Sequence, residues 1–132
     1  MKDSPGKFSV QKRIKSFYYA FKGIKSLIVY EHNARIHLTA LLFAVMSGVY
    51  FDIDATEWIA IVIVSGMVFT AEIFNSAVER LADYVEPEKS KKIALIKDYS
   101  AAAVLVSATV SVIVGALVFF PKIEELVKHL YR

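Results

Sequence analysis

A glutamate inside an apolar run is the residue of this sequence that most clearly indicates chemistry. The run starts at Glu57-Trp58, continues as IAIVIVSGMVFTA and then meets Glu72. If a helix entered a bilayer core about 30 Å thick at Trp58, about twenty residues would bring it to Ala77, which places Glu72 inside the membrane. A carboxylate at that depth costs on the order of 1 to 3 kcal/mol, so we expect it to face a bundle interior or a wet cavity.

Four more polar residues follow Glu72 at helical spacing. They come three, four, seven and eleven positions later, so one helix would present them all on one face: Asn75, Ser76, Glu79 and Asp83. Three carboxylates on one face repel one another unless a cation or a proton intervenes, which favours a divalent metal near the membrane interface. Oxygen ligands without cysteine favour Mg²⁺. A structural alternative stays open, in which the stripe only joins neighbouring helices.

Charged residues from two other segments reach the same membrane level. Glu31 lies just ahead of the first apolar run, and Lys97-Asp98 lies just ahead of the third. Phosphoryl transfer requires a base for the attacking hydroxyl, metal-held phosphates and a cation for developing charge. Plainer alternatives stay open, because Glu31 and Arg35 could form a simple surface pair and Lys97-Asp98 could be a charged helix start.

The composition indicates lipid, not water, as the main solvent. Of 132 residues, 56% are hydrophobic, and the mean hydropathy is +0.48. The absence of cysteine excludes disulfides and thiol chemistry. No nucleic-acid motif accompanies the net charge of +3, so we expect phosphates and anionic headgroups as partners and no nucleic acid. Neither a GxxxxGKS/T loop nor a Gly-rich kinase loop occurs. His32 and His37 are expected to be interfacial polar residues, not metal ligands, because neither has a partner at ligand spacing.

The apolar segments predict an all-α membrane protein that forms a single domain over residues 1–132. Its expected parts are a flexible tail (1–7), an interfacial amphipathic helix (8–30), three transmembrane helices (34–51, 57–83 and 97–120), a cytoplasmic loop (84–96) and an extracytoplasmic tail (121–132). We expect the C-terminal tail to form a short amphipathic helix on the outer surface.

The distribution of lysine and arginine predicts the orientation. Residues 1–35 carry eight of them and residues 80–98 carry five, whereas the turn FDIDATE carries none and the segment after Pro121 carries three. Because positively charged loops stay on the cytoplasmic side, we expect a cytoplasmic N-terminus and an extracytoplasmic C-terminus.

Two motifs at this spacing resemble the small prokaryotic integral-membrane diacylglycerol kinase family, which also contains undecaprenol kinases. They are EIFNSAVERLAD, from Glu72 to Asp83, and KDYSAAAVL, from Lys97 to Leu105, with support from FKGI and from Glu31 and Arg35. The resemblance implies a lipid kinase of the bacterial plasma membrane. Such an enzyme transfers the γ-phosphoryl group of Mg-ATP to the hydroxyl of diacylglycerol or undecaprenol, giving phosphatidic acid or undecaprenyl phosphate. It also implies a domain-swapped homotrimer with shared active sites.

The resemblance carries roles over to single residues. Glu72 would be the general base, and Glu31 and Glu79 would hold the metal ions and, through them, the ATP phosphates. Nucleotide contacts would also come from Lys12, Tyr19, Glu88, Lys97 and Asp98. The substrate and the site would be supported by Asn75, Ser76, Asp83, Arg35 and Ser100.

Two functions of other classes remain as alternatives. A small oligomeric ion- or proton-coupled transporter could use Glu72 as its protonatable group. A non-catalytic membrane assembly subunit would not need the carboxylate at all. Within the kinase hypothesis the lipid stays open, although the LVFFPK ending resembles undecaprenol kinases more than diacylglycerol kinases.

Overall fold

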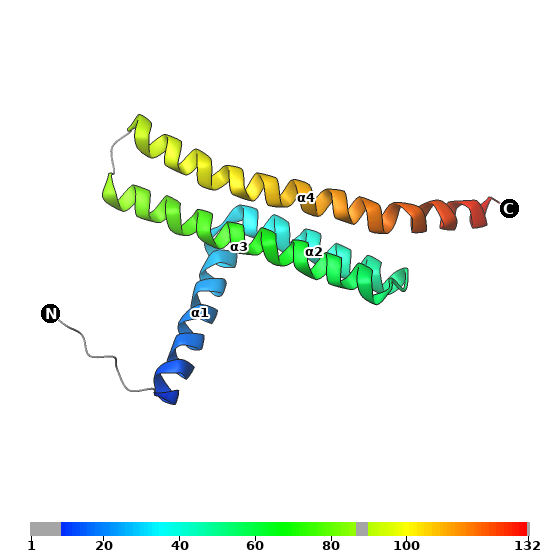
Figure 1. The fold of residues 1–132 in the computed structure, drawn as a ribbon, viewed down its shortest axis with the longest axis horizontal. Helices are drawn as coiled ribbons and strands as arrows, with labels where there is room; N and C mark the ends of the chain where they lie inside the picture. The colour runs from blue at the N-terminus through cyan, green and yellow to red at the C-terminus, as the bar shows by residue number, and fades with distance from the viewer. Residues whose placement is uncertain (1–8, 87–89, 132) are drawn as a thin grey trace.

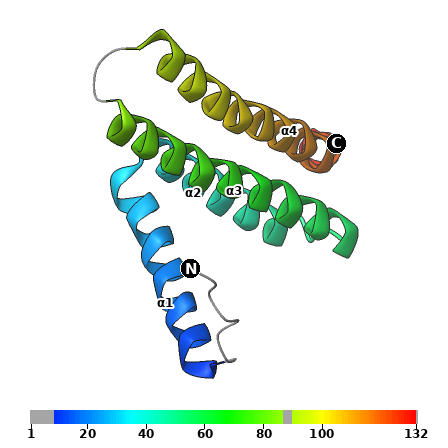
Figure 2. The ribbon, with the colours of Figure 1, turned by 60° about the vertical axis from the view of Figure 1, so that its left-hand side comes forward.

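The computed structural model describes residues 9–86 and 90–131, and the regular structure of that part of the chain is all helical. Its helices are α1 (Val10–Tyr30), α2 (His32–Tyr50), α3 (Ala55–Val85) and α4 (Lys91–Leu130). Figures 1 and 2 show α2, α3 and α4 side by side, with α4 antiparallel to α3, whereas α1 projects away from them. The all-α class predicted from the sequence is confirmed.

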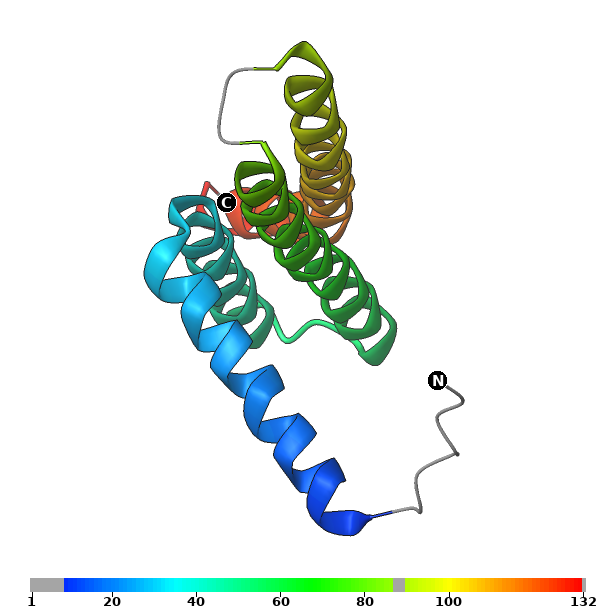
Figure 3. The ribbon, with the colours of Figure 1, turned by 90° about the vertical axis from the view of Figure 1, so that its left-hand side faces the viewer.

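A single extended residue separates α1 from α2. Helix α1 begins at the Ser9 cap, whose hydroxyl accepts the Lys12 N–H at 3.4 Å. It ends where Glu31 takes φ −99° and ψ 120°, although the Glu31 N–H still donates to the Leu27 carbonyl at 2.8 Å. Helix α2 starts at the next residue, so the two helices meet at a steep angle (Figure 3). One of the predicted metal ligands is therefore the residue at which the chain changes direction.

A compact turn joins α2 to α3. Asp52 adopts the left-handed conformation, with φ 50°. The Asp54 side chain accepts the N–H groups of Thr56 and Glu57 at 2.7 and 2.9 Å, and the Glu57 carboxylate accepts the Asp54 N–H at 2.9 Å. This reciprocal capping box fixes the start of α3.

The small apolar core lies next to this turn. Ile53, Ile61 and Val118 are buried together, and Trp58 packs against them. Gly48 allows the close approach of α2, because a Cβ there would lie 2.8 Å from the Trp58 ring. These contacts hold the adjoining ends of α2 and α3 against α4.

Helices α3 and α4 are each long and apolar enough to cross a bilayer. Only 33% of the apolar window of α3 and 11% of that of α4 are buried within the chain, whereas the core helix of a soluble protein would be mostly buried. Helix α2 does not reach the same apolarity, because its first turns contain His32, Asn33 and Arg35. The structure is thus consistent with an all-α membrane protein, and the third span stays a prediction.

Helix ends differ from the sequence-based expectation at α4. The expected third span ended at residue 120 and followed a loop over 84–96, whereas α4 begins at Lys91 and runs through Pro121 to Leu130. Proline removes the hydrogen bond to the carbonyl of Leu117, but one such loss, about 3 kcal/mol, does not end a helix that continues on both sides. The C-terminal segment is therefore not a separate helix. The expected tail over 1–7 lies outside the described residues.

Candidate functional site

Helix α3 places Glu72 in the interior of the helix packing. It is 1% exposed and is the largest fully buried side chain among the described residues. Its Oε1 lies 3.2 Å from Nε2 of His37 on α2. The same oxygen accepts no well-aligned hydrogen bond from the described part of the chain. Because burying a carboxylate is costly, a buried carboxylate with so few aligned donors is a good candidate for accepting a proton from another molecule.

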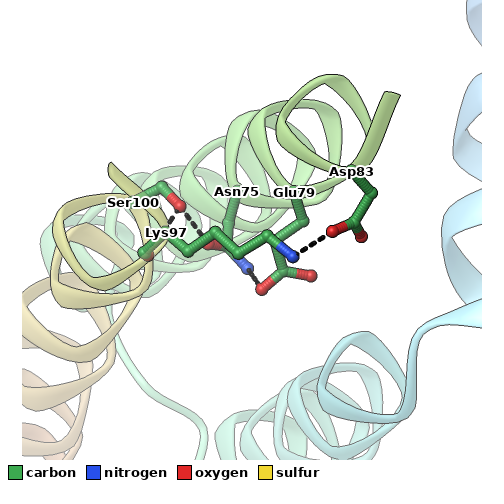
Figure 4. Close-up of polar contacts among 5 residues, drawn as sticks. All are labelled: Asn75, Glu79, Asp83, Lys97 and Ser100. Atoms are coloured by element: carbon green, nitrogen blue, oxygen red, sulfur yellow. Dashed lines mark hydrogen bonds and ion pairs between the residues drawn. The ribbon is translucent and has the colours of Figure 1, made fainter. Parts of the chain in front are cut away.

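Two hydrogen bonds through Asn75 connect Ser100 on α4 to Glu79 on α3 (Figure 4). The Ser100 hydroxyl donates to Oδ1 of Asn75 at 2.7 Å, and Nδ2 of Asn75 donates to Oε1 of Glu79 at 3.2 Å. The two bonds fix the orientation of the Asn75 amide, because its oxygen faces a donor and its nitrogen faces an acceptor. Glu79 is thus oriented by an uncharged amide, and none of the ion pairs among the described residues involves it.

Lys97 crosses from α4 to form an ion pair with Asp83 on α3 (Figure 4). The Asp83 side chain is 67% exposed and that of Lys97 is 32% exposed. Exposed ion pairs contribute about 0 to 1 kcal/mol, so Lys97 can exchange this partner for a phosphate at little cost. The predicted nucleotide-binding cation is therefore close to the acidic face of α3.

Glu31 pairs with an arginine that the sequence analysis did not single out. Nη2 of Arg80 donates to Oε1 of Glu31 at 3.1 Å. The simple pair of Glu31 with Arg35, left open above, does not form among the described residues, and Nη2 of Arg35 lies 3.5 Å from Nδ1 of His32 instead. The reason is the extended backbone of Glu31, which takes its side chain out of the helical register of α2.

Both predicted metal ligands lie close enough to Glu72 for the charges to interact. The described residues contain no group of three or more His, Asp or Glu side chains arranged to hold a metal ion. Mg²⁺ usually takes one or two carboxylates and completes its shell with water and phosphate oxygens. Glu31 and Glu79 therefore fit Mg²⁺ bound together with a nucleotide better than Mg²⁺ held by the protein alone.

Several predicted site residues lie apart from the contacts around Glu72 and Glu79. Lys12 and Tyr19 are exposed on α1, the helix that projects away from α3 and α4 (Figure 3). Asp98 is exposed on α4. Ser76 is buried, at 8% exposure, and faces a groove shared with α1. Glu88 lies outside the described residues.

Two residues that the sequence does not predict for the site, His37 and Arg80, contact Glu72 and Glu31 in the structure. His37 contacts Glu72 from another helix, so no spacing along the chain could have indicated it. Arg80 directly follows Glu79 inside the EIFNSAVERLAD motif, and a positive charge among a row of acids was the available signal.

An apolar groove of about 500 Å³ starts beside His37 and runs between α2, α3 and α4. Of the described residues that line it, His37 is the ionisable one, and the others are apolar or small, with three serines. A groove of this kind can hold a hydrocarbon chain whose polar end lies near His37.

Comparison with known proteins identifies relatives along most of the chain. The sequence profile of a family described as prokaryotic diacylglycerol kinase matches residues 18–119. The undecaprenol kinase of Bacillus subtilis is 32% identical over 109 residues, which cover 83% of this chain and 89% of that protein. The diacylglycerol kinase of Escherichia coli is 30% identical over 107 residues, which cover 81% and 88%. The described cluster, from Glu31 to Ser100, falls within the matched range, whereas Lys12 lies before it.

Proposed function

This chain belongs to the prokaryotic diacylglycerol kinase family and is a lipid kinase, and we propose that it transfers the γ-phosphoryl group of Mg·ATP to the hydroxyl of a membrane lipid alcohol. The alcohol is diacylglycerol or undecaprenol, and the product is phosphatidic acid or undecaprenyl phosphate. The observation that carries this proposal is the buried Glu72 carboxylate, which lies beside an apolar groove and near further acidic residues.

Glu72 acts as the general base. Its carboxylate takes the proton from the lipid hydroxyl while the hydroxyl oxygen attacks the γ-phosphorus and the bond to ADP breaks. A base in this position must be reached from the membrane, because the substrate hydroxyl comes from a lipid. The groove between α2, α3 and α4 supports such a path, since it opens along the apolar part of the helices.

The remaining polar residues bind the nucleotide. Glu31 and Glu79 would hold Mg²⁺, which would supply positive charge against the phosphates and the transition state. Lys97 gives up Asp83 and binds a phosphate oxygen, and Asn75 keeps Glu79 in place. The ion pair of Glu31 with the exposed Arg80 would have to open for Glu31 to hold the metal.

The proposed assembly has three spans and three copies. With α2 as a further span, the N-terminus is cytoplasmic and the C-terminus is extracytoplasmic, as the lysine and arginine distribution favours. The wide exposed apolar faces of α3 and α4 leave room for neighbouring subunits. A homotrimer with shared active sites would allow Lys12, Tyr19 and Asp98 to reach a nucleotide bound partly by another copy.

A side-by-side lipid assay tests the function. Purified protein is mixed with γ-labelled ATP and with diacylglycerol or undecaprenol in mixed micelles, with and without Mg²⁺. We expect Mg²⁺-dependent transfer of label to one lipid or to both. A folded protein that labels neither lipid would contradict the proposal. The same protein in proteoliposomes should show no ion flux without nucleotide, which separates a kinase from the transporter alternative.

A further inference from the structure

The contact between His37 and Glu72 joins two helices that the chain connects only through the turn at the opposite end. His37 belongs to the second turn of α2, and Glu72 lies deep in α3. Nε2 and Oε1 lie 3.2 Å apart, and the two side chains are 20% and 2% exposed. The imidazole is thus partly exposed, and it contacts a carboxylate that is almost fully buried.

The charges around Glu72 make this contact more than packing. Glu31 and Glu79, the other acids close to it, are negative and cannot donate a hydrogen bond to it. Of the described residues, His37 is the one that the structure places in ion-pair contact with Glu72. With a hydrogen on Nε2, the ring can donate across this 3.2 Å contact once the ring and the carboxylate align, in the neutral form as well as in the charged form.

We propose that His37 is a positioning residue for the catalytic base: its Nε2 holds Oε1 of Glu72 so that the second carboxylate oxygen faces the lipid hydroxyl. This inference rests on the proposed function and deepens it. His37 itself neither gains nor loses a proton in the reaction. The proton moves from the lipid hydroxyl to Glu72, and the contact of Nε2 with Oε1 persists before and after the transfer.

His37 also lines the apolar groove, so it is placed where the substrate chain and the base meet. An oriented base needs both its distance and its direction fixed, and a rotation of the carboxylate about its last torsion would lose the direction. A ring that reaches across from α2 prevents that rotation. The effect is expected in the chemical step and not in the binding of ATP.

Amide substitutions separate positioning from packing. Glutamine places its amide nitrogen where Nε2 of histidine lies, whereas the shorter asparagine places it near Nδ1 and cannot reach Glu72. We expect His37→Gln to keep kcat within a few-fold of the wild type. His37→Asn and His37→Leu should lower kcat at least about tenfold without raising the KM for Mg·ATP. The matched controls are His129→Gln and His129→Asn, at an exposed position near the end of α4.

A double-mutant cycle provides the second readout. Glu72→Asp shortens the carboxylate and withdraws it from His37, so His37→Asn should cost clearly less in a Glu72→Asp protein than in the wild type. A purely structural role predicts equal costs in both backgrounds.

The outcomes are distinguishable. If wild-type protein phosphorylates no lipid, the proposed function fails. If the wild type is active and Gln and Asn at position 37 behave alike, or if the loss appears in KM instead of kcat, only the role of His37 is overturned. Thermal unfolding in the same micelles checks that the Gln and Asn variants are equally folded, and unequal unfolding that accounts for the difference in kcat would also overturn it.

Discussion

Four carboxylates, three on α3 and one between α1 and α2, differ in the group that each of them contacts. Glu72 faces an imidazole, Glu31 a guanidinium, Asp83 an ammonium and Glu79 an uncharged amide. A mobile surface cation is exchanged easily, whereas an amide neither neutralises a carboxylate nor competes for it. Among these four, Glu79 is therefore the carboxylate that suits the proposed metal site best, and Glu72 is the most buried.

Removing the charge of Glu72 should stop turnover without changing nucleotide binding or stability. Glu72→Gln keeps the shape of the side chain but cannot accept the proton, so we expect kcat to fall by about 10²- to 10⁴-fold. The KM for Mg·ATP and the thermal unfolding midpoint should change little, because the amide costs no more to bury than the carboxylate. Lipid phosphorylation and a melting curve measure these effects. A silent substitution would favour the assembly subunit.

Substitution of Glu79 tests whether this carboxylate binds the metal. Glu79→Gln leaves the hydrogen bond from Asn75 possible but removes the charge, so we expect the Mg²⁺ concentration for half-maximal activity to rise about tenfold or more. A Mg²⁺ titration at saturating ATP measures it. Glu125→Gln, at an exposed position in the last turns of α4, is the matched control and should leave the titration unchanged. Equal titrations for both variants would remove Glu79 from the metal site.

At the scale of the helices, local patterns could be predicted and contacts between helices could not. The long apolar runs around Glu72 and after Tyr99 indicated α3 and α4, and the spacing from Glu72 to Asp83 indicated one shared face. The sequence shows which residues share a face, but not which face of a neighbouring helix meets it. That is why the sequence does not indicate the partners of Glu72 and Glu31, and why Pro121 predicts a helix end although α4 continues past it.

Gly48 sets how closely α2 and α3 approach at the end of the molecule away from Glu31. A methyl group there would lie 2.8 Å from the Trp58 ring and 3.0 Å from Ile53, so Gly48→Ala should destabilise the fold by about 1 to 3 kcal/mol. The control is Gly66→Ala, where nothing lies within 4 Å and the better helix propensity of alanine should raise stability slightly. Unfolding midpoints in detergent compare the two. An equal effect of both substitutions would contradict the close packing.

At the scale of the whole molecule, α2, α3 and α4 expose a largely apolar surface, and their charges other than Glu72 lie toward the helix ends. Such a chain is stable in a bilayer with its apolar faces against lipid or other copies. The number of spans decides where the acidic face lies, because Glu31, Glu79 and Lys97 can meet cytoplasmic ATP only if they share the cytoplasmic side. Topology is therefore part of the proposed mechanism.

The absence of cysteine makes the topology directly testable. Single cysteines at Gln11, Thr56, Lys92 and Glu125 are labelled with a membrane-impermeant maleimide in intact and in permeabilised cells. If α2 spans the membrane, the cysteines at positions 56 and 125 should react in intact cells, and those at 11 and 92 only after permeabilisation. Positions 11 and 56 on the same side would exclude α2 as a span.

The single extended residue between α1 and α2 has a mechanical consequence. Any tilt of α1 relative to α2 must change the backbone angles of Glu31, because no other residue separates the two helices. With an amphipathic α1 resting at the lipid surface, the thickness and packing of that surface would set the tilt and, with it, the direction of one carboxylate. The physical state of the bilayer would thus act on a carboxylate of the proposed nucleotide site.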